Sequence, residues 1–389
     1  MNIRNFAMFK QYAAENDVKR CIVRCDLNIP SDIEDLSRIY AIKDTVFEIL
    51  NLGLKISLIS HYKRPVPTDA GNPMFSLKNV LKSLIKVFEK EVEFVRGSIF
   101  DLDTASITAE IALLDNLRFY DGETKDSDDF ARRLAQFGDV YINDAFSVSH
   151  RKHASICAIT KHLPSFAGLS FLRELDGISK ACANIECPFS AIIGGSKVSS
   201  KIGVLNQISK KADFLIIAGA MANTFLVAKG KDMKNSLIEI EQIDTAKKIM
   251  KNAKSEIILP EDFLAAENIN AKGSNFSCDN LPSGFSCFDI GQKSIEEVIE
   301  IIGKSKTLLW NGAIGAFEFS NFNTATEKIT KIIAEKTKIG TLISVIGGGE
   351  TVASIANEKD NMSFVSTAGG AFLELVSGSK LPGIEALIL

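Results

Sequence analysis

The sequence predicts an α/β fold with two doubly wound parallel-sheet domains joined by a helix and a hinge. Short apolar runs rich in β-branched residues alternate with amphipathic stretches of helical period, a pattern typical of parallel sheets covered by helices on both faces. The 389 residues are many for one domain and suit two, each with its own core. The number of candidate strands also favours two sheets of about five or six strands over one large open sheet.

The expected elements follow from hydrophobic periodicity along the chain. In the first half, we expect strands at 20–26, 54–60, 111–115 and 139–144, and helices at 76–90 and 128–137. In the second half, we expect strands at 189–193, 213–218, 255–259, 306–310, 341–346 and 362–366, and a helix at 295–303.

The boundary between the domains is expected near residues 165–187. The segment FLRELDGISKACANIEC, ending at Cys187, has the pattern of one long helix, and Pro188 opens the next strand. Residues 1–167 would then form the first domain, 168–187 the connecting helix and 188–374 the second domain. The alternative is that this segment is an ordinary surface helix of a single large sheet.

The composition excludes several classes of protein. A net charge of −3 argues against a general nucleic-acid binder, and no apolar run approaches the length of a membrane span. The N-terminal segment is charged throughout, unlike a secretory signal. Seven cysteines without a CxxC pair suit a reducing cytoplasm, and the four histidines show no metal-ligand spacing, which argues against a structural zinc site.

Charged side chains follow the predicted strands of the first half. Ligands of open parallel sheets bind outside the carboxyl ends of the strands, so these segments are the place to look for a site. All 11 arginines of the chain occur at or before Arg173. Guanidinium groups bind carboxylate and phosphate through paired hydrogen bonds, which predicts a site for a small polyanion. The residues in these segments are Asp26, Asn28, Arg38, His61, Arg64, Arg118, His150 and Arg151.

Glycine turns follow the predicted strands of the second half, where 19 of the 26 glycines lie after residue 180. Such turns, when they run into helices, present backbone N–H groups to phosphates. One domain that binds a polyanion and another that binds phosphates would suit transfer of a phosphoryl group between a nucleotide and a small acid. The turns occur in GGSKVSSK, AGAMANTF, NGAIGAFE, VIGGGETVAS and STAGGA.

Two of these turns carry charged residues that have a second interpretation. Lys197 and Lys201 are either a solvated pair on one helix face or a phosphate clamp, and the preceding GGS favours the clamp. Glu350 is either a first-turn acid that favours the helix dipole or a ligand of a cation placed between it and a phosphate. The chain lacks the GxxxxGK[ST] motif of P-loop proteins, and no GxGxxG follows the first strand.

Taken together, the motifs resemble those of phosphoglycerate kinase of the bacterial type over essentially the whole chain. The matching stretches are RCDLNIP, HYKRP, LLDNLRFYDGETK, DVYINDAFSVSHRKHAS, AIIGGSKVSSKI, MANTFL, LLWNGAIGAFE, VIGGGETVAS and FVSTAGGAFLELV. The resemblance implies a glycolytic kinase that reversibly transfers a phosphoryl group between 1,3-bisphosphoglycerate and MgADP, giving 3-phosphoglycerate and MgATP. It also implies that the tail, residues 375–389, packs back on the first domain.

Residue roles are implied by position within the family motifs. The phosphoglycerate ligands would be Asp26, Leu27, Asn28, Arg38, His61, Tyr62, Lys63, Arg64, Arg118 and Arg151. The nucleotide ligands would be Gly195, Lys197, Lys201, Asn311, Glu318, Gly348, Gly349, Glu350 and Thr351, with Glu350 also binding Mg²⁺. Arg38, Lys197, Gly369 and Gly370 would act at the transferred group.

The chain departs from the usual family motifs at several turns. These positions include Tyr62, Lys63, Ala313, Glu350 and Ala368. Two alternatives therefore stay open: a catalytically weak relative that binds nucleotide and acid, and a kinase of another small phosphorylated acid. We expect a cytoplasmic monomer whose partners are small molecules, with neither nucleic acid nor membrane among them.

Overall fold

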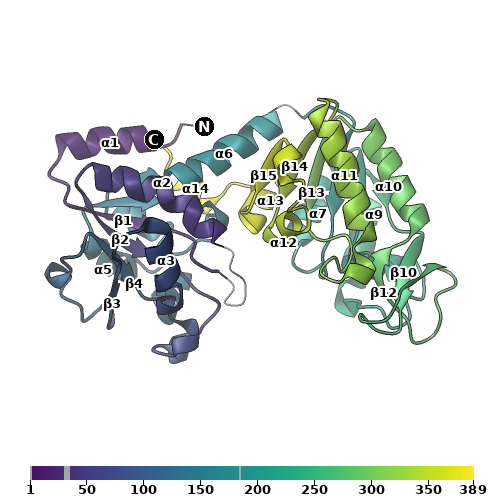
Figure 1. Ribbon diagram of the computed structural model, residues 1–389, viewed down its shortest axis with the longest axis horizontal. Helices are drawn as coiled ribbons and strands as arrows, with labels where there is room; N and C mark the ends of the chain where they lie inside the picture. Colours follow the sequence, from purple (N-terminus) through teal and green to yellow (C-terminus); the bar gives the residue numbers. More distant parts are fainter. Residues whose placement is uncertain (1, 30–35, 184) are drawn as a thin grey trace. The chain divides into compact units, whose positions relative to one another are not determined.

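The computed structural model describes residues 2–29, 36–183 and 185–389, and for 181–183 the backbone alone. Pro30 of the RCDLNIP motif and residue 184 of the expected connecting helix lie outside the described residues. The chain divides into two compact units (Figure 1): unit 1 comprises Met1–Asp176 and Lys380–Leu389, and unit 2 comprises Gly177–Ser379. The boundary falls within helix α6 (Leu169–Ala183). The domain limits expected from the sequence stay predictions.

Unit 1 is built on a six-stranded parallel sheet with the order β3-β4-β2-β1-β5-β6. The chain moves to one side of β1 first and then returns to place β5 on its other side. This reversal makes the carboxyl ends of β1 and β5 the expected ligand position. The strands are β1 (Arg20–Arg24), β2 (Lys55–Ile59), β3 (Glu93–Val95), β4 (Ile111–Leu114), β5 (Val140–Asn143) and β6 (Ser165–Ala167).

Alternate residues of these strands enter two different cores, as expected for a sheet covered on both faces. Val23 belongs to a core shared with α1, α2 and α3, whereas Ile22 belongs to a core shared with α5. The continuous apolar runs of the sequence therefore reflect burial on both faces. The helices are α1 (Phe6–Glu15), α2 (Ser37–Asn51), α3 (Leu81–Phe88), α4 (Asp121–Thr124) and α5 (Asp128–Leu134).

The last ten residues complete unit 1 rather than unit 2. Helix α14 (Pro382–Glu385) begins with proline, and the backbone N–H of Gly383 donates to the Ser149 carbonyl at 2.8 Å. Near the chain end, Ile388 forms an antiparallel bridge with Ile3. The first and last segments of the chain are therefore neighbours within one unit.

Unit 2 contains a second six-stranded parallel sheet, with the order β15-β14-β13-β7-β8-β9. From β7 the chain adds β8 and β9 on one side, and then β13, β14 and β15 on the other. This is the 3-2-1-4-5-6 order of dinucleotide-binding folds, with its switch point between β7 and β13. The strands are β7 (Phe189–Ile193), β8 (Phe214–Ile217), β9 (Glu256–Ile258), β13 (Thr307–Asn311), β14 (Ile343–Gly347) and β15 (Phe364–Ser366).

Helices pack on both faces of this sheet. Leu308 and Trp310 share a core with α10 and α11, while Phe372 of α13 lies against Gly347 on the other face. Gly347 is required there, because an added Cβ would lie 2.0 Å from the Phe372 ring. The helices are α7 (Ile202–Ile208), α8 (Ala220–Ala228), α9 (Ile243–Asn252), α10 (Gln292–Lys304), α11 (Thr324–Lys338), α12 (Gly349–Ser354) and α13 (Gly369–Ser377).

A small antiparallel sheet in unit 2 was not predicted from the sequence. It has the order β11-β10-β12, formed by β11 (Ser274–Ser277), β10 (Asp262–Ala266) and β12 (Ser286–Ile290). The polar segment SNFS of β11 carries no β-branched residue, so the usual strand signal is absent there. This sheet supplies one wall of the cavity described below.

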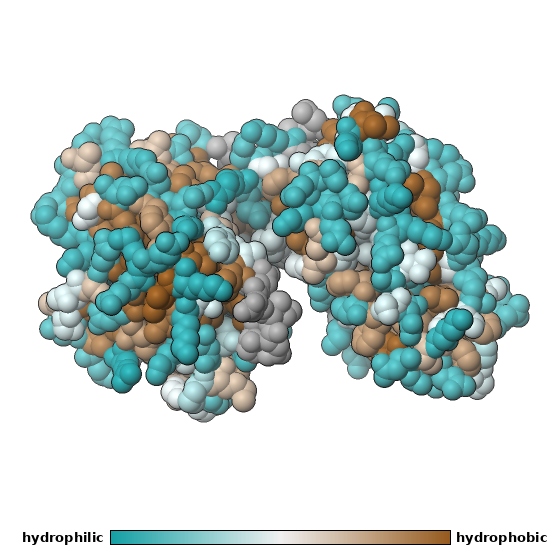
Figure 2. Space-filling view, in the orientation of Figure 1, coloured by the Kyte–Doolittle hydropathy of each residue, from teal (hydrophilic) through white to brown (hydrophobic). Residues whose placement is uncertain are grey.

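Hydrophilic side chains cover much of the visible face of each unit (Figure 2). Within the described residues, no helix combines the length and the apolar character that a membrane crossing requires.

Candidate active site

Asp26 and Arg38 form an ion pair beyond the carboxyl end of β1. Asp26 follows the strand directly, and Arg38 lies at the start of α2, with 2.7 Å between its Nη1 and Asp26 Oδ2. Ser147, beyond β5, donates its hydroxyl to the same oxygen at 2.5 Å. Burial alone would raise the pKa of Asp26, but the Arg38 charge and these hydrogen bonds lower it to about 2. The two strand ends at the switch point are thus tied through one carboxylate.

The turn that follows β2 is held by two other predicted ligands. Asn28 accepts a hydrogen bond from the Lys63 backbone N–H at 2.7 Å, and Arg118 donates to the Lys63 carbonyl. Lys63 has a φ of +55°, in the left-handed region that glycine adopts most readily. Lys63 therefore adopts a backbone conformation that non-glycine residues rarely adopt.

Positive charge is concentrated around His61 and Arg118. The Arg118 side chain is largely buried, and burial together with the charges of Arg151 and Arg24 lowers its pKa to about 10. Arg151 donates to His150 Nε2 at 3.2 Å, and burial followed by the Arg151 charge lowers the pKa of His150 to about 4. A bound anion would relieve the mutual repulsion of these arginines. The same region therefore favours a polyanionic ligand.

Three further predicted ligands lie in different surroundings. Arg64 is exposed. Leu27 and Tyr62 are buried, so their side chains belong to the core, and only their backbone groups could contact a ligand. The Tyr62 backbone is already paired with the Asn116 amide through its N–H at 3.1 Å and its carbonyl at 2.6 Å. Their contacts with phosphoglycerate stay predictions.

In unit 2, the turns after β7, β13 and β14 pack directly against one another. Gly194 N–H donates to the Asn311 carbonyl at 2.9 Å, and Gly312 N–H donates to Thr351 Oγ1 at 2.7 Å. Thr351 in turn donates its hydroxyl to the Gly347 carbonyl at 3.0 Å. The buried Thr351 hydroxyl thus holds the turns together, and its predicted contact with the nucleotide stays a prediction.

Glycines are required where these turns touch. Gly312 has a φ of +91°, and a Cβ there would lie 2.2 Å from the Gly194 carbonyl oxygen. Gly348, at φ +100°, also lies close to the Asn311 amide, since a Cβ there would lie 2.7 Å from Nδ2. A Cβ added at Gly369, after β15, would lie 3.9 Å from the Gly348 Cα, which is an ordinary van der Waals distance. The structure therefore brings Gly348 and Gly369 together, with the exposed Gly370 beside them.

Lys201 lies within these packed turns. Its Nζ donates to the Gly194 carbonyl and to Asn311 Oδ1, each at 2.7 Å. Burial lowers the pKa of Lys201 to about 8, although the Glu350 charge acts in the opposite direction. Lys197, on the same loop, is exposed. The two lysines therefore differ: one is part of the site's frame, and the other is accessible from solvent.

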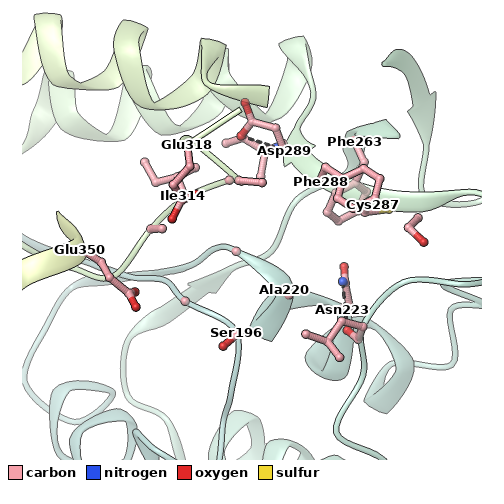
Figure 3. Close-up of a pocket in the computed structure, with 18 of the residues that line it drawn as sticks. Ser196, Ala220, Asn223, Phe263, Cys287, Phe288, Asp289, Ile314, Glu318 and Glu350 are labelled. Carbon is pink, nitrogen blue, oxygen red and sulfur yellow. Dashed lines mark hydrogen bonds between the residues drawn. The ribbon is translucent and has the colours of Figure 1, made fainter. Parts of the chain in front are cut away.

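A cavity of about 470 Å³ opens beside these turns. Figure 3 shows Glu350 at one end and Phe263, Cys287 and Phe288 at the other. Of the predicted nucleotide ligands, Gly195, Glu318 and Glu350 line it. The cavity thus has a charged end near the glycine turns and an aromatic end, a polarity that suits a nucleotide.

Several residues of this cavity were missed in the sequence. Gly219 and Ala220 belong to a turn that the sequence singled out, but no role was assigned to them. Phe263, Phe288 and Asp289 come from the antiparallel sheet, for which there was no strand signal. Asp289 accepts hydrogen bonds from the backbone N–H groups of Ile290 and Ala325, and burial raises its pKa to about 7.

The comparisons with known proteins agree with this geometry. A family model described as phosphoglycerate kinase matches residues 12–379. The phosphoglycerate kinases of Brucella melitensis and Rhizobium meliloti are 42% and 41% identical to the chain over 385 residues, covering 95% of it and 96% of each relative.

Solved structures give the same result. The structure of phosphoglycerate kinase from Coxiella burnetii, at 31% identity, superposes with a TM-score of 0.75 and covers 100% of this chain and 97% of that one. The fold is also that of phosphoglycerate kinase from Pyrococcus horikoshii, with a TM-score of 0.81 at 24% identity, over 95% of this chain and 96% of that one. With matches over nearly the full chain in sequence and in structure, the chain belongs to the phosphoglycerate kinase family, kinases whose phosphoryl acceptor is a carboxyl group.

Proposed function

We propose that the chain catalyses reversible phosphoryl transfer between 1,3-bisphosphoglycerate and MgADP, giving 3-phosphoglycerate and MgATP. The observation that carries the proposal is the polarity of the unit 2 cavity, which is aromatic at one end and bordered by glycine turns and Glu350 at the other. A nucleotide has the same polarity, with an aromatic base at one end and phosphates at the other. The arginine-rich region of unit 1 supports the acid as the second substrate.

In unit 1, the phosphate and carboxylate of the acid would be bound by the clustered guanidinium groups. Arg118 and Arg151 lie close enough to lower the pKa of Arg118, so an anion between them would be stabilised by both. The exposed Arg64 would add a third guanidinium. Asp26 would orient Arg38 through their ion pair rather than contact the anion.

In unit 2, the nucleotide phosphates would bind at the start of α12. The N–H groups of Gly349 and Glu350 belong to the first turn of that helix, where N–H groups have no partner within the helix. Gly195 and Gly348 use their own N–H groups within the turns, donating to the carbonyls of Ala313 and Ser366. These two glycines would therefore shape the site, while Lys201 supplies a buried positive charge.

Magnesium fits the residues around Glu350. Among the described residues, no group of three or more His, Cys, Asp and Glu side chains could hold a metal by itself. Mg²⁺ is commonly bound by one or two carboxylates together with substrate phosphates, and the exposed carboxylate of Glu350, which lies beside the glycine turns, meets that need. When bound, the ion would neutralise charge on the nucleotide phosphates.

The chemistry needs in-line positioning and positive charge around the transferred phosphoryl group. Arg38, with a partly exposed guanidinium, and the exposed Lys197 would supply that charge. No general base is required, because the attacking atom is an oxygen of a carboxylate or a phosphate. We also propose that the enzyme acts as a monomer in the cytoplasm on these small molecules alone.

A coupled assay with 3-phosphoglycerate and MgATP tests the proposal. We expect robust turnover that requires both substrates. Tight binding of nucleotide and acid without turnover would instead identify a catalytically weak relative. Turnover with a different phosphorylated acid but none with 3-phosphoglycerate would refute the assignment of substrate.

Glu350 gives a test of the metal site. Glu350→Gln should weaken magnesium-dependent ADP binding and strongly reduce turnover, since the carboxylate charge that holds the ion is lost. Glu350→Asp should preserve both, because aspartate keeps that charge. Isothermal titration of ADP with and without Mg²⁺ measures the difference.

The matched control is Glu327→Gln, which removes a first-turn carboxylate from α11. If Glu350 serves only the helix dipole, both glutamine variants should lower stability by under about 1 kcal/mol and leave magnesium dependence unchanged. That outcome would contradict the metal assignment.

A further inference from the structure

Arg24 is a fully buried arginine that the sequence did not mark as functional. It is the last residue of β1, and its side chain is 0% exposed. Its Nε donates to Ser155 Oγ at 2.9 Å, and its Nη2 lies 3.2 Å from His61 Nδ1. The guanidinium therefore lies behind His61, one of the proposed phosphoglycerate ligands.

The charge of Arg24 is balanced by a buried carboxylate. Glu123 is also 0% exposed, and its Oε1 lies 4.0 Å from Arg24 Nη2. Ser155 connects the two residues, since its hydroxyl accepts from Arg24 Nε and donates to Glu123 Oε1 at 2.7 Å. A buried ion stays in place only when it is paired and hydrogen-bonded in this way. The guanidinium thus has a fixed position and a permanent charge.

This contact determines which nitrogen of His61 carries the proton. A guanidinium has five N–H donors and no acceptor, so His61 Nδ1 must be the acceptor in the 3.2 Å contact. The neutral ring then carries its proton on Nε2. Within the described part of the chain, Nε2 makes no hydrogen bond to another residue, which leaves its N–H available to a ligand.

The surrounding charges keep this ring neutral. They come from several elements: Arg24 on β1, Asp26 after it, Arg118 on the turn after β4, and Arg151 beyond β5. Burial and then the three arginines lower the pKa of His61 well below its usual value, while Asp26 acts in the opposite direction. The ring therefore does not gain a second proton near neutral pH.

We propose that Arg24 is a positioning residue for the acid substrate: it fixes His61 as a neutral ring whose Nε2–H always faces the ligand as a donor. This inference rests on the proposed binding of phosphoglycerate by unit 1. Without Arg24, both neutral tautomers of His61 become accessible, and one of them presents a lone pair to an anion. The enzyme would then bind the acid through a histidine whose donor state varies with pH.

The tautomer can be measured directly in the free protein by ¹⁵N NMR. The chain has four histidines, so His61→Gln identifies the His61 signals. In the wild type we expect a non-protonated Nδ1, a protonated Nε2, and no titration between about pH 5.5 and 8.5, a range that spans the ordinary histidine pKa. A protonated Nδ1, or a titration near the usual histidine pKa, would overturn the proposal without any reference to activity.

The kinetic test is Arg24→Met, which keeps much of the side-chain length. We expect the KM for 3-phosphoglycerate to rise about tenfold at pH 8, the effect of losing one hydrogen bond to a charged ligand. As the pH falls, the KM should decrease toward the wild-type value, because loss of the Arg24 charge raises the pKa of His61 and an imidazolium donates from both nitrogens. Arg24→Lys, which retains a donor without an acceptor, should partly restore the wild-type pH profile.

Arg20→Met is the matched control, because Arg20 lies at the other end of β1. Its guanidinium donates to the carbonyls of Ile56, Ile107 and Ala109, so its loss removes comparable hydrogen bonds away from His61. The control should lower the melting temperature and leave the His61 signals and the pH profile unchanged.

The other possible results of these experiments lead to different conclusions. A KM that rises equally at all pH values in Arg24→Met would show that Arg24 is only structural and would overturn the proposal. If Arg24→Met fails to fold, the wild-type tautomer and Arg24→Lys decide the matter. Failure of the wild type to use 3-phosphoglycerate would refute the proposed function and not the measured tautomer.

Discussion

Arg38→Ala should lower the turnover number about 100-fold or more. The guanidinium is 31% exposed and is aligned by Asp26, so it is accessible to a ligand and held in one orientation. Losing one such preorganised group at a transferred phosphoryl group commonly costs roughly 3 kcal/mol of transition-state stabilisation. Steady-state kinetics at saturating substrates measure the effect. Unchanged turnover with only a raised KM would mean that Arg38 merely binds substrate.

A second explanation for a loss of turnover in Arg38→Ala can be tested by also substituting Asp26. Removing Arg38 leaves the Asp26 carboxylate without its ion-pair partner beside the acid site. If Arg38 serves only to neutralise that carboxylate, the double variant Asp26→Asn with Arg38→Ala should recover turnover. We expect no recovery. Arg132→Ala is the control, since this arginine is 61% exposed and its ion pairs with Asp128 and Asp129 lie on the surface.

Gly312→Ala should destabilise unit 2 by at least about 2 kcal/mol and abolish tight ADP binding. The added Cβ would lie 2.2 Å from the Gly194 carbonyl oxygen and 2.4 Å from Lys201 Nζ, at a φ of +91°. A backbone oxygen cannot yield as a flexible side chain can, so the turns after β7 and β13 must separate. That separation displaces Lys201 and the adjoining cavity wall.

The fluorescence of Trp310 can be used to measure the stability of Gly312→Ala. It is the one tryptophan of the chain and is fully buried at the end of β13, so its fluorescence reports the unfolding of unit 2. Gly303→Ala in α10 is the control, because a Cβ there meets nothing within 4 Å and alanine favours a helix. Wild-type stability and ADP affinity in Gly312→Ala would contradict the packing argument.

The parallel sheets could be predicted because buried strands and amphipathic helices leave strong local patterns. The positions of Asp26, Arg38 and Glu350 also follow from the sequence, since each comes soon after an expected strand. The antiparallel sheet could not be predicted, because β11 is short and polar. Its cavity residues, among them Phe288, become neighbours of the glycine turns only through long-range packing.

The hydrogen bonds between buried side chains could not be predicted from the sequence either. Arg24 looks like an ordinary charged residue at the end of a strand, and nothing local indicates that Glu123 is buried near it. Thr351 and Asn311 occupy motif positions that suggested ligand contacts, yet their side chains bond to other turns. Sequence position identifies which turns form the site, while packing decides which groups in them remain available.

The return of the last ten residues to unit 1 imposes an order on biosynthesis. Residues up to Asp176 leave the ribosome first, but the Ser149 carbonyl and the Ile3 backbone lack their partners until Gly383 and Ile388 are made. Translation of the intervening segment, residues 177–379, takes roughly 10 to 40 s at about 5–20 residues per second. Unit 2 can therefore finish folding before unit 1 does, although its sequence comes later. A nascent chain stalled before residue 380 would carry an incomplete first unit.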